Sequence, residues 1–312
     1  MDDWPDYVVD ILRNDRCVAL ATRTPAAGVA LTPVTTVGMC DIVTGTVTTS
    51  TSFGNFAKLR NIDRDPRVAL IFHTRSQSPS TRTEVLVVQG RAWFPTHADP
   101  QFADPYQIPR WTEFMPSRKR GALWDWVGQE YYDTRVPVTI QVERIVVLDG
   151  PNNEVTDVIG VPISEAPITQ TAPKNGTAPR IASRKYAKRL KKCDHTLLGW
   201  VDGDGFPTAV PVDVSLDGDL IHVPSPGIPH GSRRAGLLAH WFESKLVGQG
   251  SVVTTGWLEH HGDGCTYAPH TLGGYEVPAS DAMFAIGGGL GTKFGYRKAK
   301  KLGYVRDGVW QR

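Results

Sequence analysis

One pattern of short β-strands occurs twice in the chain, and this repeat constrains the fold more than any other feature. The run FPTAVPVDVS at 206–215 mirrors VALTPVTTV at 29–37, with Pro211 in the place of Pro33. Three further matches keep the same order and pair 219–224 with 42–49, 232–244 with 53–62, and 251–261 with 67–74. All four share an offset of roughly 175–180 residues, which indicates a tandem duplication.

The first half is rich in strand signals. Short β-branched runs bounded by Gly, Pro and polar residues predict about six strands, at 17–22, 29–37, 41–49, 67–74, 84–94 and 136–148. Helices are predicted only at 5–14, 53–62 and 121–132. Six antiparallel strands with short peripheral helices fit a small closed or split β-barrel better than a sandwich.

The composition changes after Asp149. Residues 151–179 are rich in Pro, Thr, Asn and Gly and are predicted to be a linker, within which 155–161 could add one strand. The pattern then restarts with a predicted helix over 180–192. We therefore expect a mainly β chain of two tandem split β-barrels that form an intramolecular pseudo-dimer. The predicted boundaries are 1–150 for the first barrel, 151–179 for the linker and 180–312 for a degenerate second copy.

Charge and cysteine usage exclude several classes of protein. A net charge of +2 over 312 residues gives no global electrostatic case for nucleic acid or an anionic membrane. Two basic runs, 180–192 and 293–306, lack a recognisable nucleic-acid-binding motif and are predicted to be solvated helix faces. The N-terminus lacks a secretory pattern, and the chain lacks an apolar stretch of membrane length. Four widely separated cysteines indicate a reducing compartment, so we expect a cytoplasmic protein.

The segment TTSTSFGNFAKLRNIDRDPRVALIF at 48–72 carries the clearest functional signal. A predicted strand ends in hydroxyl residues, and Ser52 is a natural N-cap for the helix that follows. Free backbone N–H groups at a helix start favour an anion such as phosphate, and Lys58 could add a compensating charge. The alternative is an ordinary capped amphipathic helix whose Lys58, Arg60 and Arg64 are solvated.

This segment resembles the FMN-binding split-barrel family of pyridoxamine 5'-phosphate oxidase-like proteins, a group of flavin and deazaflavin oxidoreductases. Family members carry a Thr-Asn-Tyr-x-Ser-Arg-Lys stretch, a hydrophobic turn, Asn-Pro and then a strand. Ser52 matches the Thr and Lys58 the Lys, while Asp65 and Pro66 match the Asn-Pro. The resemblance extends over most of the chain, because the second half resembles a degenerate second copy.

The resemblance implies roles for particular residues. Thr51, Ser52 and Lys58 would hold a cofactor phosphate, and Thr35 and Thr36 would line the flavin ring or its ribityl chain. In the second copy, Arg233 and Arg234 could reach a phosphate, and Trp257 could pack on the ring; the alternatives are a solvated basic pair and a core tryptophan.

The sequence also departs from the family pattern. Phe56 and Ala57 stand where the oxidase has Ser and Arg, and Val85 stands where Gln often contacts the flavin. The C-terminal Trp and Arg that recognise pyridoxal phosphate have no evident match, which argues against vitamin B6 oxidation. Similar departures occur in the branch of the family that uses the deazaflavin F420. FMN is therefore the expected cofactor, F420 the alternative and haem a weaker one.

Other motifs give weaker signals. His260, His261, Cys265 and His270 approach metal-ligand spacing, but a solvated loop explains them better, and we predict no metal. His230 and His240 flank the predicted helix of the second copy and are expected to be packed or surface residues. The glycine-rich run 284–295 lacks the strand–helix context of a dinucleotide fingerprint.

Three functions stay open at this point. The first is an oxidoreductase in which the cofactor ring carries the hydride to or from a small-molecule substrate. The second is a binding module that holds flavin, F420 or haem without turnover, and the third is a cofactor-free interaction protein. The chain would act as a monomeric pseudo-dimer or as a homodimer. Since Pro224, Ser225 and Pro226 occupy the second copy's matching turn and Gly236 the place of Lys58, we expect at most one phosphate site per chain.

Overall fold

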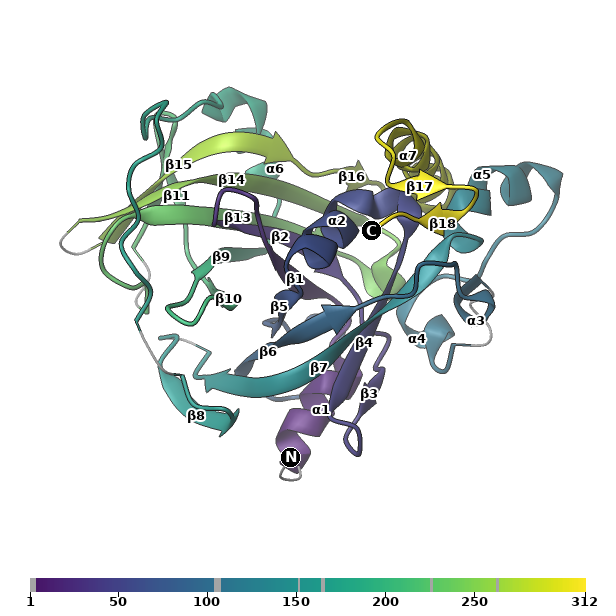
Figure 1. Cartoon of the computed structure of the whole chain (residues 1–312), viewed down its shortest axis with the longest axis horizontal. Helices are drawn as coiled ribbons and strands as arrows, with labels where there is room; N and C mark the ends of the chain where they lie inside the picture. Colours follow the sequence, from purple (N-terminus) through teal and green to yellow (C-terminus); the bar gives the residue numbers. More distant parts are fainter. Residues whose placement is uncertain (1–3, 104–107, 151, 164–165, 225–226, 262–263) are drawn as a thin grey trace.

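Two antiparallel sheets of identical strand order form the framework of the molecule (Figure 1). The computed structural model describes residues 4–103, 108–150, 152–163, 166–224, 227–261 and 264–312. In sheet order, the first sheet contains β2 Val29–Val34, β1 Val18–Arg23, β5 Arg67–Phe72, β6 Val85–Trp93, β7 Arg135–Leu148, β4 Thr46–Ser52 and β3 Cys40–Asp41, and β8 Val155–Gly160 pairs with β7. The second contains β10 Pro207–Pro211, β9 His195–Val201, β13 Arg233–Phe242, β14 Gln249–His261, β15 Gly264–Gly273, β12 Leu220–Val223 and β11 Ser215–Asp217, and β16 Glu276–Val277 pairs with β14.

The repeated strand order confirms the mainly β fold and fits a tandem duplication. Strands β2, β1, β5, β6, β7, β4 and β3 correspond in order to β10, β9, β13, β14, β15, β12 and β11. All six strands predicted in the first half occur, with the 41–49 segment divided into β3 and β4 by a tight turn. The extra strand expected within 155–161 is β8.

The predicted helix over 232–244 is wrong, because this segment forms strand β13. Its residues are buried on both faces between β9 and β14, so the near-continuous apolar run belongs to a central strand. The second copy therefore has no counterpart of the helix between β4 and β5 within its described residues. One consequence is that β14, which holds the 251–261 segment, corresponds to β6 and not to β5.

The predicted helix over 180–192 is also wrong in extent. Only the 3₁₀ turn η3 Ser183–Lys185 and the short helix α6 Ala187–Leu190 form there. The backbone N–H groups of Arg180 and Ile181 both donate to Pro269 O of β15, which holds the start of this segment against the sheet in a non-helical path. Tyr186, which separates the two turns, is buried and has a non-helical backbone conformation, so a continuous helix is interrupted there.

The helices of the first half agree with prediction. They are α1 Asp6–Asn14, the 3₁₀ turn η1 Phe53–Asn55 that leads into α2 Phe56–Arg64, and α5 Ala122–Tyr132, with short turns at α3 Pro100–Ala103 and α4 Trp111–Phe114. In the second half, the turn η4 Ser244–Leu246 joins β13 to β14. Among the described helices, none combines the length and apolarity needed to cross a bilayer.

The final segment of the chain returns to the first barrel. Helix α7 Asp281–Lys301 lies beside α5 and α2, followed by the hairpin β17 Val305–Arg306 and β18 Val309–Trp310 (Figure 1). Its Ala299 and the ring of Trp310 are buried in the core of the first barrel together with Phe53 and Phe94. The close approach depends on glycine, since a Cβ at Gly295 would collide with the carbonyl oxygen of Gly54.

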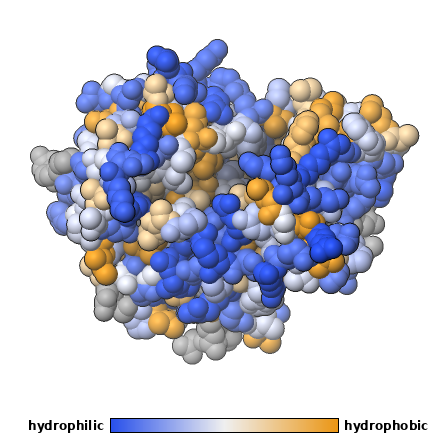
Figure 2. Space-filling model, turned by 45° about the horizontal axis from the view of Figure 1, so that its top comes forward, coloured by the Kyte–Doolittle hydropathy of each residue, from blue (hydrophilic) through white to orange (hydrophobic). Residues whose placement is uncertain are grey.

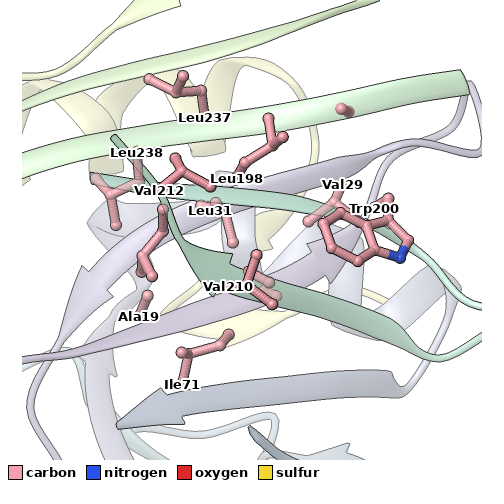
Figure 3. Close-up of a cluster of buried hydrophobic side chains, with 14 of the residues drawn as sticks. Ala19, Val29, Leu31, Ile71, Leu198, Trp200, Val210, Val212, Leu237 and Leu238 are labelled. Atoms are coloured by element: carbon pink, nitrogen blue, oxygen red, sulfur yellow. The ribbon is translucent and has the colours of Figure 1, made fainter. Parts of the chain in front are cut away.

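The two sheets share one apolar core. Ala19, Leu31 and Ile71 of the first sheet pack against Leu198 and Val210 of the second (Figure 3). Because these side chains are almost completely buried, their desolvation stabilises the pairing of the two barrels as well as each barrel.

Polar contacts complete this interface. The guanidinium of Arg144 on β7 pairs with Asp204 of the β9–β10 turn, with 2.5 Å between Nη1 and Oδ2. Gln89 donates from Nε2 to Pro207 O at 2.9 Å and to Asp202 Oδ2 at 3.3 Å. On the outer surface, apolar residues gather over α5 and α7 (Figure 2), where Leu123, Trp126 and Phe294 are exposed.

Candidate functional site

A pocket of about 390 Å³ lies where the first sheet, the second sheet and α7 meet. The first barrel contributes residues of β2, β4, α2 and β7, and the second contributes residues near β14 and β16. The lining comprises Cys17, Thr32, Pro33, Val34, Thr35, Ser50, Thr51, Asn55, Lys58, Met115, Tyr131, Arg135, Leu246, Gln249, Tyr275, Val277, Phe284, Gly287, Gly288, Gly291 and Thr292. The site is therefore built from both copies and is complete only when α7 is in place.

Two cations face this pocket without an acidic residue among its described lining. Arg135 is 5% exposed, and its guanidinium lies over the rings of Trp111 and Tyr131, at 5.1 and 4.9 Å from their centroids. Its Nη2 donates to Ser50 Oγ at 2.6 Å, while its buried Nε has no hydrogen-bond partner. Burial, and then the charge of Arg135, lower the pKa of Lys58 to about 8. Such a pair of under-compensated cations favours an anionic ligand.

Hydroxyl groups line the pocket beside the cations. Thr51 is 3% exposed, and its buried Oγ1 has no hydrogen-bond partner. Thr35 Oγ1 accepts from the backbone N–H of Val37 at 3.1 Å, which leaves its own proton free to be donated. Because a buried hydroxyl without a partner costs free energy, these groups fit a ligand that carries acceptor oxygens.

Two residues expected at the site lie just outside the pocket. Ser52 caps η1, accepting from Gly54 N at 3.0 Å, and its Oγ also lies 2.7 Å from Glu130 O. Thr36 is completely buried, and its Oγ1 has no partner. The structure thus places Thr35, Thr51 and Lys58 in the pocket and gives Ser52 a capping contact next to it.

The second-copy candidates lie elsewhere. Arg233 and Arg234 are on β13, and Trp257 is opposite Arg234 on β14. Arg234 donates from its backbone N and from Nη1 to Gln170 Oε1, at 3.1 and 3.2 Å, and its guanidinium packs over the Trp257 ring. Arg233 is 1% exposed and donates to His230 O. None of the three lines the pocket.

A second groove of about 360 Å³ occupies the corresponding position of the other copy. Thr208 and Val210 line it from β10, the strand equivalent to β2, and Val87 and Leu148 line it from the first sheet. Its described lining contains Asp202 but neither Lys nor Arg, and burial raises the pKa of Asp202 to about 6. This groove is poorly suited to phosphate. Ser225 and Pro226 of the expected turn lie outside the described residues.

The described part of the chain contains no candidate metal site. Within the described residues, no three or more His, Cys, Asp or Glu side chains are arranged to hold a metal ion. Of the histidines considered from sequence, His270 has Nε2 at 3.4 Å from Thr177 O, and the side chain of His261 lies outside the described residues. His240 lies on β13, which corrects its expected place beside a helix.

Two elements of the site were missed from sequence. Arg135 gave no signal, since nothing in the sequence distinguishes it from other arginines at strand starts. The run at 284–295 did carry one, because Gly287, Gly288, Gly291 and Gly295 recur at helical spacing and create a small-residue face. Gly287, Gly288 and Gly291 line the pocket, and Gly295 lies against η1.

Comparison with known proteins adds remote structural matches. No family model and no curated protein matches the sequence. A pyridoxamine 5'-phosphate oxidase-related, FMN-binding protein from Nostoc punctiforme aligns over 68% of this chain and 98% of its own, with 12% identity and a TM-score of 0.34. A putative pyridoxamine 5'-phosphate oxidase from Listeria innocua aligns over 46% and 96%, with 16% identity and a TM-score of 0.30. General stress protein 26 from Bacillus anthracis aligns over 50% and 97%, with 11% identity and a TM-score of 0.33. The structural matches of the chain thus include pyridoxamine 5'-phosphate oxidase-related split-barrel proteins, and its two sheets fit a tandem duplication of such a unit.

Proposed function

We propose that the pocket at Lys58 and Arg135 binds a phosphate-bearing aromatic cofactor, FMN in the first place, and that the protein is an oxidoreductase acting on a small molecule. The observation that carries the proposal is the combination of two cations, the unpartnered Thr51 hydroxyl and a described lining without carboxylates. A phosphate monoester fits this combination, because it brings negative charge to the two cations and acceptor oxygens to the Thr51 hydroxyl.

The rest of the pocket suits a flat ring. Away from the cations, it is lined by Leu246, Tyr275, Val277 and Phe284, and its volume lies in the usual range for small-molecule sites. When bound, a flavin supplies the hydride or electron chemistry through its own ring. The chain's part is to neutralise the phosphate with Lys58 and Arg135, to orient the ligand through Thr35 and Thr51, and to exclude water with the apolar wall.

F420 and haem are the alternatives for the same pocket, and a carrier without turnover is the alternative for the activity. F420 also presents a phosphate, so Lys58 and Arg135 would serve it equally. We further propose a cytoplasmic protein that does not act on nucleic acid and in which the two barrels of one chain replace the two subunits of a dimer.

Titration with FMN and with F420 tests the proposal. Purified protein is first examined by absorption spectroscopy for bound flavin, deazaflavin or haem, and is then titrated with each ligand. Lys58→Ala should weaken the binding of the phosphate ligand by about 1.5–3 kcal/mol, the worth of a charge-assisted hydrogen bond. Lys188→Ala on the exposed face of α6 is the matched control and should bind like the natural protein. Equal affinity of Lys58→Ala and Lys188→Ala would remove Lys58 from the site.

A further inference from the structure

Three titratable side chains form a hydrogen-bonded line from the pocket into the interface between the barrels. Cys17 lines the pocket just before β1, and its Sγ lies 3.9 Å from Nδ1 of His240 on β13. Nε2 of His240 lies 2.7 Å from Nε2 of His73, which follows β5. Nδ1 of His73 lies 3.1 Å from Ile71 O. Cys17 is 5% and His240 1% exposed, and His73 is partly buried, so the end of the line at the pocket is sheltered from bulk water.

The two imidazoles meet at equivalent positions of the two copies. Strand β5 corresponds to β13, and Ala69 lies opposite Ala21 as Gly236 lies opposite Gly199. Counting onward from Ala69 and from Gly236 brings His73 level with His240. The contact between them therefore crosses the junction of the two barrels, and the line joins the pocket to the second copy.

The backbone carbonyl at one end dictates the order of protons along the line. Ile71 O can only accept, so His73 donates through Nδ1–H, and its Nε2 is unprotonated in the neutral ring. His240 must then donate its Nε2–H to His73, which leaves Nδ1 of His240 unprotonated. The thiol of Cys17 donates to that nitrogen. One consistent set of neutral groups satisfies every contact.

We propose that Cys17, His240 and His73 form a proton relay that opens into the anion pocket. A proton that reaches the sulfur from a bound ligand displaces the thiol proton to Nδ1 of His240. The Nε2 proton of His240 passes to Nε2 of His73, which becomes an imidazolium still bonded to Ile71 O. No bond between heavy atoms forms or breaks, and the reverse sequence returns the proton.

The surroundings keep the relay neutral at rest. Burial lowers the pKa of both His73 and His240. The charge that His73 would carry lowers the pKa of His240 further, and the neighbouring His195 acts in the same direction on both imidazoles. Burial, followed by the nearby Asp15 carboxylate, raises the pKa of the Cys17 thiol to about 12. His73 and His240 are thus unprotonated at rest, and the low pKa of His73 makes its imidazolium a transient state that gives the proton back.

The relay rests on the proposed function for its substrate. In an oxidation that transfers a hydride to a flavin, a compound such as an alcohol must also lose a proton, and Cys17 is the group of the relay that faces the pocket. The substrate class that we infer is therefore a compound that loses a hydride and a proton together.

Alkylation of Cys17 by N-ethylmaleimide tests proton transfer without any cofactor. The sulfur forms a bond to carbon while its proton passes to His240, and the maleimide enolate takes a proton from water. In a Cys40→Ser/Cys193→Ser background, with the labelled residue identified by mass spectrometry, His240→Leu should slow the reaction by about 10- to 100-fold, as for loss of a general base. His73→Leu should slow it less, and His97→Leu, an exposed histidine, should leave it unchanged.

The possible outcomes test the proton relay independently of the proposed cofactor. Loosened packing would expose the sulfur and speed alkylation, so a slower reaction cannot come from unfolding. An unchanged or faster reaction in His240→Leu overturns the relay, whether or not FMN binds. Slower alkylation in His240→Leu, together with failure of FMN to protect Cys17 in the natural protein, would leave the relay standing and reject FMN as the occupant of the pocket.

Discussion

Lys58 of α2 and Arg135 of β7 face the same pocket, and the positive charge of Arg135 adds to burial in lowering the pKa of Lys58 to about 8. The pairing of like charges is unfavourable in the empty protein and becomes favourable when an anion lies between them. Two opposite dependences on pH follow, one for ligand binding and one for stability.

The affinity for a phosphate ligand should fall as the pH rises through about 8, because Lys58 then loses its proton and its charge. Titrations with FMN between pH 7 and pH 9.5 measure the effect. Lys58→Arg should bind with little pH dependence over this range, since a guanidinium stays protonated. An equal fall in Lys58→Arg would assign the dependence to another group.

The stability of the ligand-free protein should depend on pH in the opposite direction. The unfolded chain binds the Lys58 proton more tightly than the folded chain, because the folded pKa lies below the ordinary value of 10.5. Stability therefore rises with pH between about 8 and 10.5 as far as Lys58 contributes. Comparing urea unfolding of the natural protein with that of Lys58→Met across this range isolates the contribution.

Two glycines of α7 give a matched test of its packing. Gly295→Ala should destabilise the protein by about 1–3 kcal/mol, because the new Cβ meets the backbone of Gly54, which cannot move aside cheaply. Gly291→Ala meets no atom within 4 Å and should stabilise α7 by about 0.5–1 kcal/mol. Thermal unfolding without ligand measures both. Similar effects of the two substitutions would mean that the contact between α7 and η1 is looser than described.

Binding should saturate at one phosphate ligand per chain. The second groove has a similar volume, but its described lining offers Asp202 and no cation. Calorimetric titration gives the stoichiometry, and Lys58→Ala should weaken the single observed site. A value near two ligands per chain would show that the second groove also accepts phosphate.

The interface between the barrels should depend on Arg144. Its side chain is 3% exposed, so Arg144→Leu would deprive Asp204 of its ion-pair partner and should cost about 3 kcal/mol. Arg82→Leu removes the exposed pair of Arg82 with Glu84, at 4.0 Å, and should cost at most about 0.5 kcal/mol. Urea unfolding compares the two variants, and equal costs would show that the buried pair adds little.

Much of the fold could be predicted because local signals and tertiary environment agree. The β-branched runs of the first half become strands, and the order of strands recurs in the second half. The segment 232–244 shows where this agreement ends. Leu237, Leu238 and Trp241 occur at spacings that suit a helix, but β9 and β14 on either side supply hydrogen-bond partners that only a strand can use.

The candidate site was predictable only in part. Thr51 and Lys58 belong to one continuous segment, so a strand-to-helix motif brings them to one place, and Thr35 was expected there from the family resemblance. Arg135, Tyr275 and Gly291 reach the pocket from distant parts of the chain. Their convergence depends on how the barrels pair and where α7 packs, which neither periodicity nor spacing specifies.

The placement of α7 has a consequence for the synthesis of the protein. The residues that hold the phosphate in our proposal leave the ribosome early, within the first barrel, whereas the helix that closes their pocket follows the whole second barrel in the chain. A nascent first barrel would expose the surface that α7 later covers, including Phe53 and the wall beside Lys58. The pocket is thus complete only after α7 has been made and has folded back, so the proposed cofactor would bind the finished two-barrel chain and not the first barrel alone.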